Sequence, residues 1–472
     1  MSRSPRRDDP SATNLLAMIS QSIPKRTWRY AAAATVALVS IACSSGTDGV
    51  ADDAPGTSIP VPTPVPTATV QPTPTTVPEG GPRIQLKPTP TGTLAEQIRD
   101  GFLNGRVDDG WNFDITKVTP GLKVGLFTKP SELGKDGIPS IDTPEYASAS
   151  NAPDYMRPEE PVIQVSINGD ARAFPLSILM WHEIVNDTVG GEPVTVTFCP
   201  LCNNSIVFSG KHEGELLEFG TTGWIANADL VMYDRLTETW WQQITGEGLV
   251  GEFAGTKLTF LPSAIVGWQE FADQFPDGKV LLRPEPGTLH PISGAEITFN
   301  RTYDDPPYSG YDVAGSLPIF FTGAFDGRLQ PIDRVVALNL DGESVSYPFR
   351  SLAVQPIVND TVGQQEIVIF YDDGTESAFR TSTRGHNYQT PGSTTVFSRN
   401  ADGQLLTFSA DDAGTITDAE TGSTWNKFGL AMEGDLVGTQ LDAIVHGAEF
   451  WFAIATFHPG TEVRLQELLA SE

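Results

Sequence analysis

The chain of 472 residues is 39% hydrophobic, which is enough material for two or three domains with cores of their own. Its formal net charge is −29 at pH 7, and the acidic residues are spread along the chain rather than gathered in one block. Because so acidic a surface repels phosphate backbones, the charge argues against nucleic acid as a partner.

The N-terminal residues have the features of an export signal. Basic residues precede the apolar run "YAAAATVALVSIAC", which is too short for a comfortable membrane span. The end of this run resembles a bacterial lipobox, with Ala42 before Cys43, although Ser40 stands where that pattern prefers leucine. We expect a lipoprotein-type signal peptide over 1–42, lipidation of Cys43, and an extracytoplasmic protein anchored in the cell membrane. An uncleaved N-terminal anchor is the alternative.

Residues 43–93 are dense in proline and threonine. Such a composition cannot bury a core and favours an extended spacer of about 3 Å per residue. It is typical of a stalk that holds a lipid-anchored domain clear of the membrane. Outside the cytoplasm, a disulfide between neighbouring cysteines is permitted.

Two segments of the remaining chain are similar to each other. "VIQVSINGDARAFPLSILMWHEIVNDTVGG", from Val162, aligns without a gap with "VVALNLDGESVSYPFRSLAVQPIVNDTVGQ", from Val335. The similarity predicts an internal duplication. The expected organisation is a lead-in segment over 94–156, repeat 1 over 157–295, a connecting loop over 296–330, and repeat 2 over 331–472.

Each repeat has the same pattern of elements. Alternating apolar and polar residues predict a hairpin, with Asn168-Gly169 and Asp341-Gly342 as the turn dipeptides. Proline then begins a short helical stretch, "PLSILMWHEIV" in the first copy, and further strands and a final helical piece follow. The predicted fold class is α+β and β-rich, a tandem duplicated domain with short helices.

The motif "CPLC" is the strongest candidate for a functional site. Cys199 and Cys202 lie between "VTVTF" and "SIVF", whose alternation predicts a tight loop between two strands. No long amphipathic helix follows the motif. A thioredoxin fold is therefore disfavoured, because there the motif begins a helix whose dipole stabilises the thiolate.

Three roles for these cysteines stay open on spacing alone. In a redox pair, Cys199 would be the nucleophile and Cys202 the resolving thiol of a strained, reducible disulfide. A metal site would need further ligands, for which His182 is the nearest candidate, His212 is another, and Met232 would suit copper. A structural disulfide would close a loop too short to give much stabilisation.

The second repeat lacks these residues. Its aligned segment "IVIFYDDGTESAF" places Asp372 and Thr375 opposite the two cysteines, and Gln355 stands opposite His182. Since the sister unit does without the sulfurs, the fold does not require them. This favours a chemical role for the first repeat.

Other polar residues give weaker signals. In "DLVMYDRLTETWWQQ", Asp234 and Arg235 could pair with each other, but residues in such positions more often cap and close a hairpin. His446 and His458 are expected to be ordinary surface or core residues. The sequence contains no phosphate loop, nucleophile elbow, zincin helix or dinucleotide fingerprint.

Three motifs, "TFCPLCNNSIVF", "LVMYDRLTETWWQ" and "FNRTYDDPPYSGYD", together resemble the bacterial and archaeal family DUF3179, from about residue 158 to residue 461. The resemblance implies an exported, often lipid-anchored protein with no assigned activity. Some members carry selenocysteine within the Cys-x-x-Cys motif, which implies redox chemistry at Cys199 and Cys202.

These observations lead to one main hypothesis and two alternatives. The main one is a thiol–disulfide or peroxide-type redox activity at Cys199 and Cys202, with His182 tuning thiolate character and a thiol redox protein as partner. The first alternative is a module that binds zinc, copper or iron through Cys199, Cys202 and His182. The second is a non-catalytic envelope scaffold. The sequence names no substrate.

Overall fold

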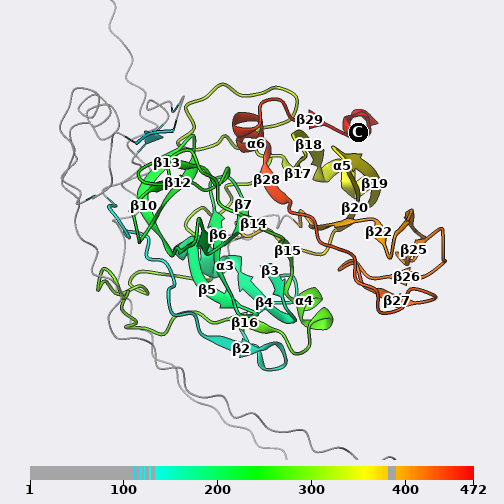
Figure 1. Ribbon diagram of the computed structural model, residues 1–472, viewed down its shortest axis with the longest axis horizontal. Coiled ribbons are helices and arrows are strands. Elements are labelled where there is room, and N and C mark those ends of the chain that lie inside the picture. The colour runs from blue at the N-terminus through cyan, green and yellow to red at the C-terminus, as the bar shows by residue number, and fades with distance from the viewer. Residues whose placement is uncertain are drawn as a thin grey trace, which may run out of the picture. The chain divides into compact units, whose positions relative to one another are not determined.

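The computed structural model describes residues 111, 117–119, 122, 127–128, 133–380 and 390–471 (Figure 1). These residues all belong to one compact unit, Gly80–Glu472. The expected signal peptide, the lipidated Cys43, the linker and most of the lead-in segment lie outside the described residues. Within the described ranges, no helix is both long and apolar enough to cross a membrane.

The first half of the described chain is built around two sheets and two short helices. A five-stranded sheet has the order β15-β3-β4-β16-β2, and a four-stranded sheet has the order β14-β7-β6-β5. The elements are β2 (Tyr146–Ser148), β3 (Pro161–Ile167), β4 (Asp170–Pro175), α3 (Leu176–His182), β5 (Ile184–Val189), β6 (Glu192–Cys199), β7 (Asn204–Ser209), β14 (Phe260–Leu261), β15 (Ala264–Gly267), α4 (Trp268–Gln274) and β16 (Lys279–Leu281).

A third sheet completes this half, with the order β1-β10-β11-β12-β13. Its strands are β1 (Phe127–Thr128), β10 (Phe219–Ala226), β11 (Asp229–Asp234), β12 (Trp240–Gln242) and β13 (Gly248–Val250), and the small hairpin of β8 (Lys211–His212) and β9 (Glu215–Leu216) precedes it. Residues 297–330 then follow as turns and bends, without a helix or strand.

The second half has a similar series of elements. Its sheets have the orders β28-β17-β18-β29, β19-β20-β21 and β24-β25-β26-β27, and β22 and β23 form a hairpin. The elements are β17 (Arg334–Leu340), β18 (Glu343–Pro348), α5 (Phe349–Val354), β19 (Ile357–Val362), β20 (Gln365–Asp372), β21 (Ser393–Ser398), β22 (Asn400–Ala401), β23 (Gln404–Leu405), β24 (Phe408–Ala410), β25 (Ile416–Asp418), β26 (Thr424–Trp425), β27 (Ala431–Glu433), β28 (Gly447–Phe450), α6 (Trp451–Phe457) and β29 (Glu462–Val463).

The predicted turns and the predicted β-rich class are confirmed. Asn168 and Gly169 have φ of 50° and 81°, and Asp341 and Gly342 have φ of 50° and 85°. Positive φ at both central residues is the type I′ geometry that matches the twist of a hairpin. The first helix is shorter than "PLSILMWHEIV" suggested. It ends at His182 because Glu183 has a φ of 58°, after which Ile184 begins a strand.

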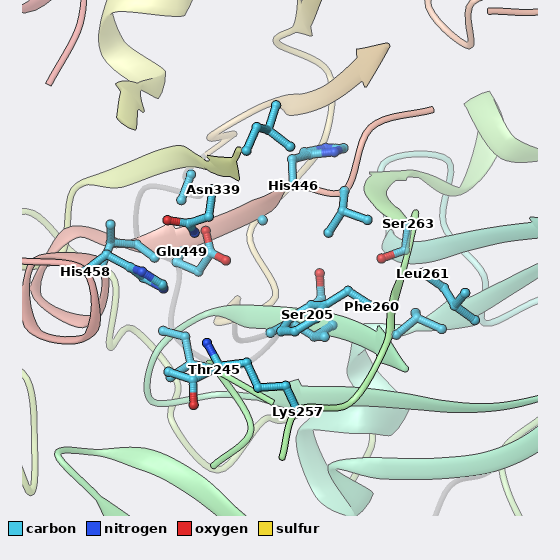
Figure 2. A pocket seen from close by; sticks show the side chains of 18 residues that line it. Ser205, Thr245, Lys257, Phe260, Leu261, Ser263, Asn339, His446, Glu449 and His458 are labelled. Carbon is cyan, nitrogen blue, oxygen red and sulfur yellow. The ribbon is translucent and has the colours of Figure 1, made fainter. Parts of the chain in front are cut away.

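The two halves share their largest core. Ile163 and Phe198 from the first half lie in the same buried cluster as Val335, Phe450 and Trp451 from the second. β28 packs beside β7, and a pocket of about 440 Å³ lies where β28, β17 and α6 face β7 and β14 (Figure 2).

Candidate functional site

The cysteine motif forms the tight loop that the alternating pattern predicts. β6 ends at Cys199 and β7 begins at Asn204, and these two residues pair in the ladder. The Cys202 N–H donates to the Cys199 carbonyl at 3.2 Å, and Asn203 has a φ of 52°. The loop is therefore a narrow turn that holds both sulfurs on one side of the strand ends.

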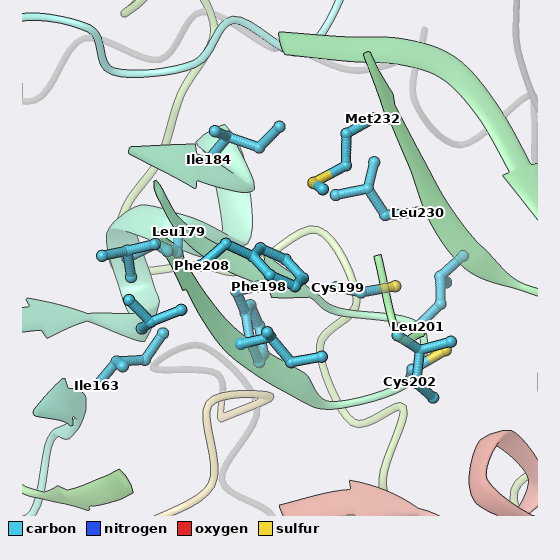
Figure 3. Packing of buried hydrophobic residues seen from close by; sticks show 14 of the residues in the cluster. Ile163, Leu179, Ile184, Phe198, Cys199, Leu201, Cys202, Phe208, Leu230 and Met232 are labelled. Carbon is cyan, nitrogen blue, oxygen red and sulfur yellow. The ribbon is translucent and has the colours of Figure 1, made fainter. Parts of the chain in front are cut away.

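Asp229 completes a group of three buried side chains. The two sulfurs and a carboxylate oxygen of Asp229 all lie within 4.8 Å of one another, and all three residues are buried. Asp229 begins β11, directly after a turn in which Asn227 and Ala228 have φ of 51° and 67°. The turn also directs the Ala228 carbonyl toward the sulfurs, which donate to it at 3.7 Å from Cys199 and 3.3 Å from Cys202. Figure 3 shows the two sulfurs near each other at the edge of the apolar cluster.

One oxygen of Asp229 is left without a partner. Its Oδ2 accepts hydrogen bonds from the Gln242 side chain and, at 3.0 Å, from the Ile244 N–H. Its Oδ1 is buried and accepts no hydrogen bond from the described residues. Burial raises the pKa of Asp229 to about 7. An unpartnered carboxylate oxygen beside two sulfurs is a suitable set of metal ligands.

Both cysteines are free thiols, and neither is readily ionised. Cys199 is 2% exposed and Cys202 is fully buried. Burial raises the pKa of Cys199, with a further contribution from the charge of Asp229, and it raises the pKa of Cys202 well above its ordinary value. Since the thiolate is the nucleophile and the metal ligand, these thiols need a base or a metal ion to become reactive.

His182 lies outside this group of three. Its Nδ1 donates to the Pro139 carbonyl at 2.8 Å, which leaves Nε2 to accept from the Tyr303 hydroxyl at 2.9 Å. The ring stacks on Tyr303, and burial lowers the pKa of His182 to about 4. The side chain thus ties the end of α3 to the 297–330 segment as a neutral imidazole.

His212 and Met232, the other ligands considered from the sequence, lie in different surroundings. His212 lies in the β8–β9 hairpin, where its Nε2 is 2.9 Å from Thr256 Oγ1 and its ring meets the rings of Trp241 and Phe253 edge-on. Met232, on β11, lies in the same core cluster as the cysteines. His212 therefore takes part in an aromatic contact, whereas Met232 shares the core around the sulfurs.

Asp229 is the site residue that the sequence reasoning missed. Asp234 closes a hairpin in the first half, and Asp418 closes a matching hairpin in the second. Asp229 precedes Asp234 by five residues, and the residue five before Asp418 is an alanine. The second hairpin is shorter, since Phe219 pairs with Asp234 in the first and Phe408 pairs with Asp418 in the second. Counting back five residues therefore gives no structural equivalent of Asp229, and the repeat carried no clear signal for it.

The second half has a different connection at the corresponding place. Asp372 ends β20 as Cys199 ends β6, and it pairs with Ser393 at the start of β21. The chain between them spans residues 373–392, whereas only residues 200–203 separate the two strands in the first half. Thr375 therefore lies in a longer connection and has no close counterpart in the cysteine loop.

The comparisons with known proteins give a family. The family model described as "Protein of unknown function (DUF3179)" matches residues 135–461. The comparison with curated proteins found no match, and neither did the comparison with solved structures. The matched range covers the sheets and the cysteine site described above, and the chain therefore belongs to the DUF3179 family.

Proposed function

We propose that Cys199, Cys202 and Asp229 bind a metal ion, and that zinc is the ion that fits best. The supporting observation is the buried Oδ1 of Asp229, which has no hydrogen-bond partner among the described residues and lies within 4.8 Å of both sulfurs. A zinc ion displaces the thiol protons and compensates the buried negative charge, which is otherwise costly. Two sulfurs and a carboxylate are ligands that zinc accepts, and they leave a fourth position for another ligand.

Metal analysis of the full-length chain tests this proposal. Gently purified, anaerobic protein should contain about one metal ion per chain, and Cys199→Ser, Cys202→Ser and Asp229→Asn should each lose it. Glu160→Gln is the matched control, because Glu160 is a buried carboxyl outside the group of three and its charge is not among those that act on the cysteines or Asp229. If the reduced wild-type chain contains no metal and takes up no zinc on titration, the proposal is wrong.

Thiol–disulfide exchange with a thiol redox protein is the second candidate. It is favoured by the pKa of Asp229, which burial raises to about 7, so that its carboxylate can accept a proton from a thiol near neutral pH. Oxidation of the dithiol to a disulfide transfers two electrons to the partner's disulfide, whose S–S bond breaks to give two thiols. Both protons pass to these thiols, one of them by way of the Asp229 carboxylate.

Alkylation distinguishes the two candidates. In a redox protein, both cysteines become labelled only after mild reduction, and Asp229→Asn slows the exchange. In a metal protein, chelation rather than reduction exposes the thiols. If neither treatment changes the labelling and no metal is present, the scaffold alternative is favoured.

We also propose that Cys43 anchors the chain in the cell membrane, on the strength of the apolar run and lipobox-like residues before it. Incorporation of labelled palmitate and partitioning into the detergent phase should both be lost in Cys43→Ala. Retention in the membrane fraction without palmitate labelling would favour the uncleaved anchor.

We further propose that the two halves arose by duplication. Both hairpins pair in the same register, and in each half a later strand adds antiparallel to the first strand and another adds parallel to the second. Failure of β3–β7 to superpose on β17–β21 would contradict this origin.

A further inference from the structure

The pocket between β28 and β7 has the size of a small-molecule site. Its volume of about 440 Å³ lies within the range usual for such sites. The walls are mainly apolar, with Ile206, Val207, Leu261 and Ile454 among the lining side chains. Figure 2 shows the polar side chains that lie among them.

Glu449 is the notable polar group of this pocket. It is 5% exposed, and its Oε2 is buried without a hydrogen-bond partner among the described residues. Burial, with a smaller contribution from Asp229, raises the pKa of Glu449 to about 8. A buried carboxyl group that lacks a partner costs free energy, and a ligand that pairs with it removes this cost.

The fold does not need a carboxyl group at this position. By strand register, Glu449 on β28 corresponds to Val266 on β15, and Gly447 corresponds to Ala264. Val266 is fully buried in an apolar cluster of the first half. A valine is therefore compatible with the corresponding position in the sheet of the first half.

Gly447 makes room for the carboxyl group. A Cβ at Gly447 would collide with Oε1 of Glu449, so an alanine there would require the Glu449 side chain to move. Where β15 has Ala264 and Val266, β28 has glycine and glutamate, and the glycine leaves the space in which the Glu449 side chain lies.

The imidazoles that line the pocket carry no charge that would oppose a bound cation. Burial lowers the pKa of both His446 and His458, so these imidazoles are neutral near pH 7. Lys257, which also lines the pocket, is exposed. Glu449, whose pKa burial raises to about 8, is mostly protonated at pH 7, and it becomes the carboxylate that an ammonium group can pair with when a cation binds or the pH rises.

We propose that this pocket binds a small amine whose ammonium group pairs with Glu449 and whose apolar body lies against the aliphatic walls. A charge-assisted hydrogen bond in a buried place is stronger than a neutral one. The amine site is separate from the proposed metal site, because none of Cys199, Cys202 and Asp229 lines the pocket.

Calorimetric titration of the full-length chain tests the proposal, with benzylamine as probe and benzyl alcohol as its neutral analogue. Benzylamine should bind more tightly than benzyl alcohol. Glu449→Gln should weaken benzylamine binding by roughly 10- to 100-fold and change benzyl alcohol binding by no more than about 3-fold.

Two further variants keep the test decisive. Glu449→Val should fold, because Val266 occupies the matching position, and it should also lose benzylamine binding. Glu252→Gln, which changes an exposed carboxylate that does not line the pocket, should keep the wild-type affinity. The proposal is overturned if benzylamine does not bind the wild type, or if it binds both Glu449 variants as tightly as the wild type.

The expected benzylamine binding does not depend on whether the proposed metal site exists. In Cys199→Ser and Cys202→Ser chains, benzylamine affinity should stay within about 3-fold of the wild-type value, whether or not these chains have lost a metal ion. A larger loss in both serine variants would contradict a separate amine site.

Discussion

At the scale of single residues, buried acidic groups distinguish this interior. Burial raises the pKa of Asp229 to about 7, and of Glu183 and Glu449 to about 8. Strongly shifted carboxyl groups in a protein interior are more common at functional sites than elsewhere. Asp229 lies beside the two sulfurs and Glu449 lies in the pocket, so each of these two carboxyl groups belongs to one of the two proposed sites.

Acid should destabilise the protein through His182. Burial lowers its pKa to about 4, whereas an unfolded histidine titrates near 6.5, so the unfolded chain binds the extra proton first as pH falls. His182 therefore costs no stability above pH 6.5 and progressively more as pH falls from 6.5 to 4.

This pH dependence can be isolated with His182→Asn, which keeps a donor for Pro139 but does not titrate. The free energy of unfolding of the wild type, minus that of the variant, should fall by about 3 kcal/mol between pH 7 and pH 4. Urea denaturation at several pH values measures it, and parallel pH profiles would show that His182 is not buried as a neutral group.

Gly447→Ala should destabilise the wild type by about 1–3 kcal/mol, because its Cβ displaces the Glu449 carboxyl group. In a Glu449→Val background the same change should cost less than about 1 kcal/mol, since Ala264 and Val266 coexist in β15. A double-mutant cycle from urea denaturation gives the coupling, and strictly additive effects would refute the steric link.

Only some of the residues of the candidate site could be predicted from the sequence. The spacing of Cys199 and Cys202 identified the motif, because two residues between cysteines have chemical meaning whatever the fold. Asp229 comes from a different hairpin and reaches the sulfurs only through tertiary packing. Glu449 is similar, since its burial depends on how β28 packs beside β7.

At the scale of secondary-structure elements, one hairpin design occurs twice. Asp234, at the end of β11, accepts from the Trp241 indole at 3.0 Å, and Asp418, at the end of β25, accepts from the Trp425 indole at 2.9 Å. Each aspartate also accepts from a threonine three residues later. Asp234 thus closes its hairpin, while Arg235 pairs with Asp142 at 3.0 Å instead.

Asp234→Ala and Asp418→Ala should each lower the free energy of unfolding by about 2–4 kcal/mol, because each leaves a buried indole N–H and a turn without an acceptor. The corresponding asparagine variants keep one acceptor oxygen and should cost less. Chemical denaturation measures the four values. A change below about 0.5 kcal/mol for either alanine variant would contradict a structural role for that hairpin.

Local sequence patterns predicted which elements form better than they predicted where those elements end. The turn dipeptides identified both hairpins because positive φ depends mainly on the residue itself. The end of α3 was misjudged because "HEIV" has no glycine or proline, and the left-handed conformation of Glu183 is imposed by its surroundings.

At the scale of the whole unit, the two halves are joined through the cysteine loop. The Phe450 N–H donates to the Cys202 carbonyl at 2.9 Å, and the Asn203 side chain donates to the Ala448 carbonyl at 2.6 Å. Because of these contacts and the shared core, each half is stabilised by packing on the other. The repeated sequence could not predict this, because similarity between segments does not say whether they pack together.

We therefore expect one cooperative unfolding transition for residues 133–471, and no stable fold for either half alone. Calorimetry of the full-length chain should show one transition, and circular dichroism of the separate fragments 133–295 and 331–472 should lack cooperative melting. Two well-separated transitions, or a fragment that melts cooperatively, would contradict this dependence.

The contact between Asn203 and Ala448 has a consequence for biosynthesis. Asn203 and Ala448 are 245 positions apart in the chain. At about 5–20 residues per second, the ribosome therefore adds Ala448 roughly 10–50 s after Asn203. During this interval the nascent chain carries both thiols without the strand that later covers their loop. In whichever compartment the chain folds, an ion or an oxidant reaches the two thiols most easily before β28 packs on their loop.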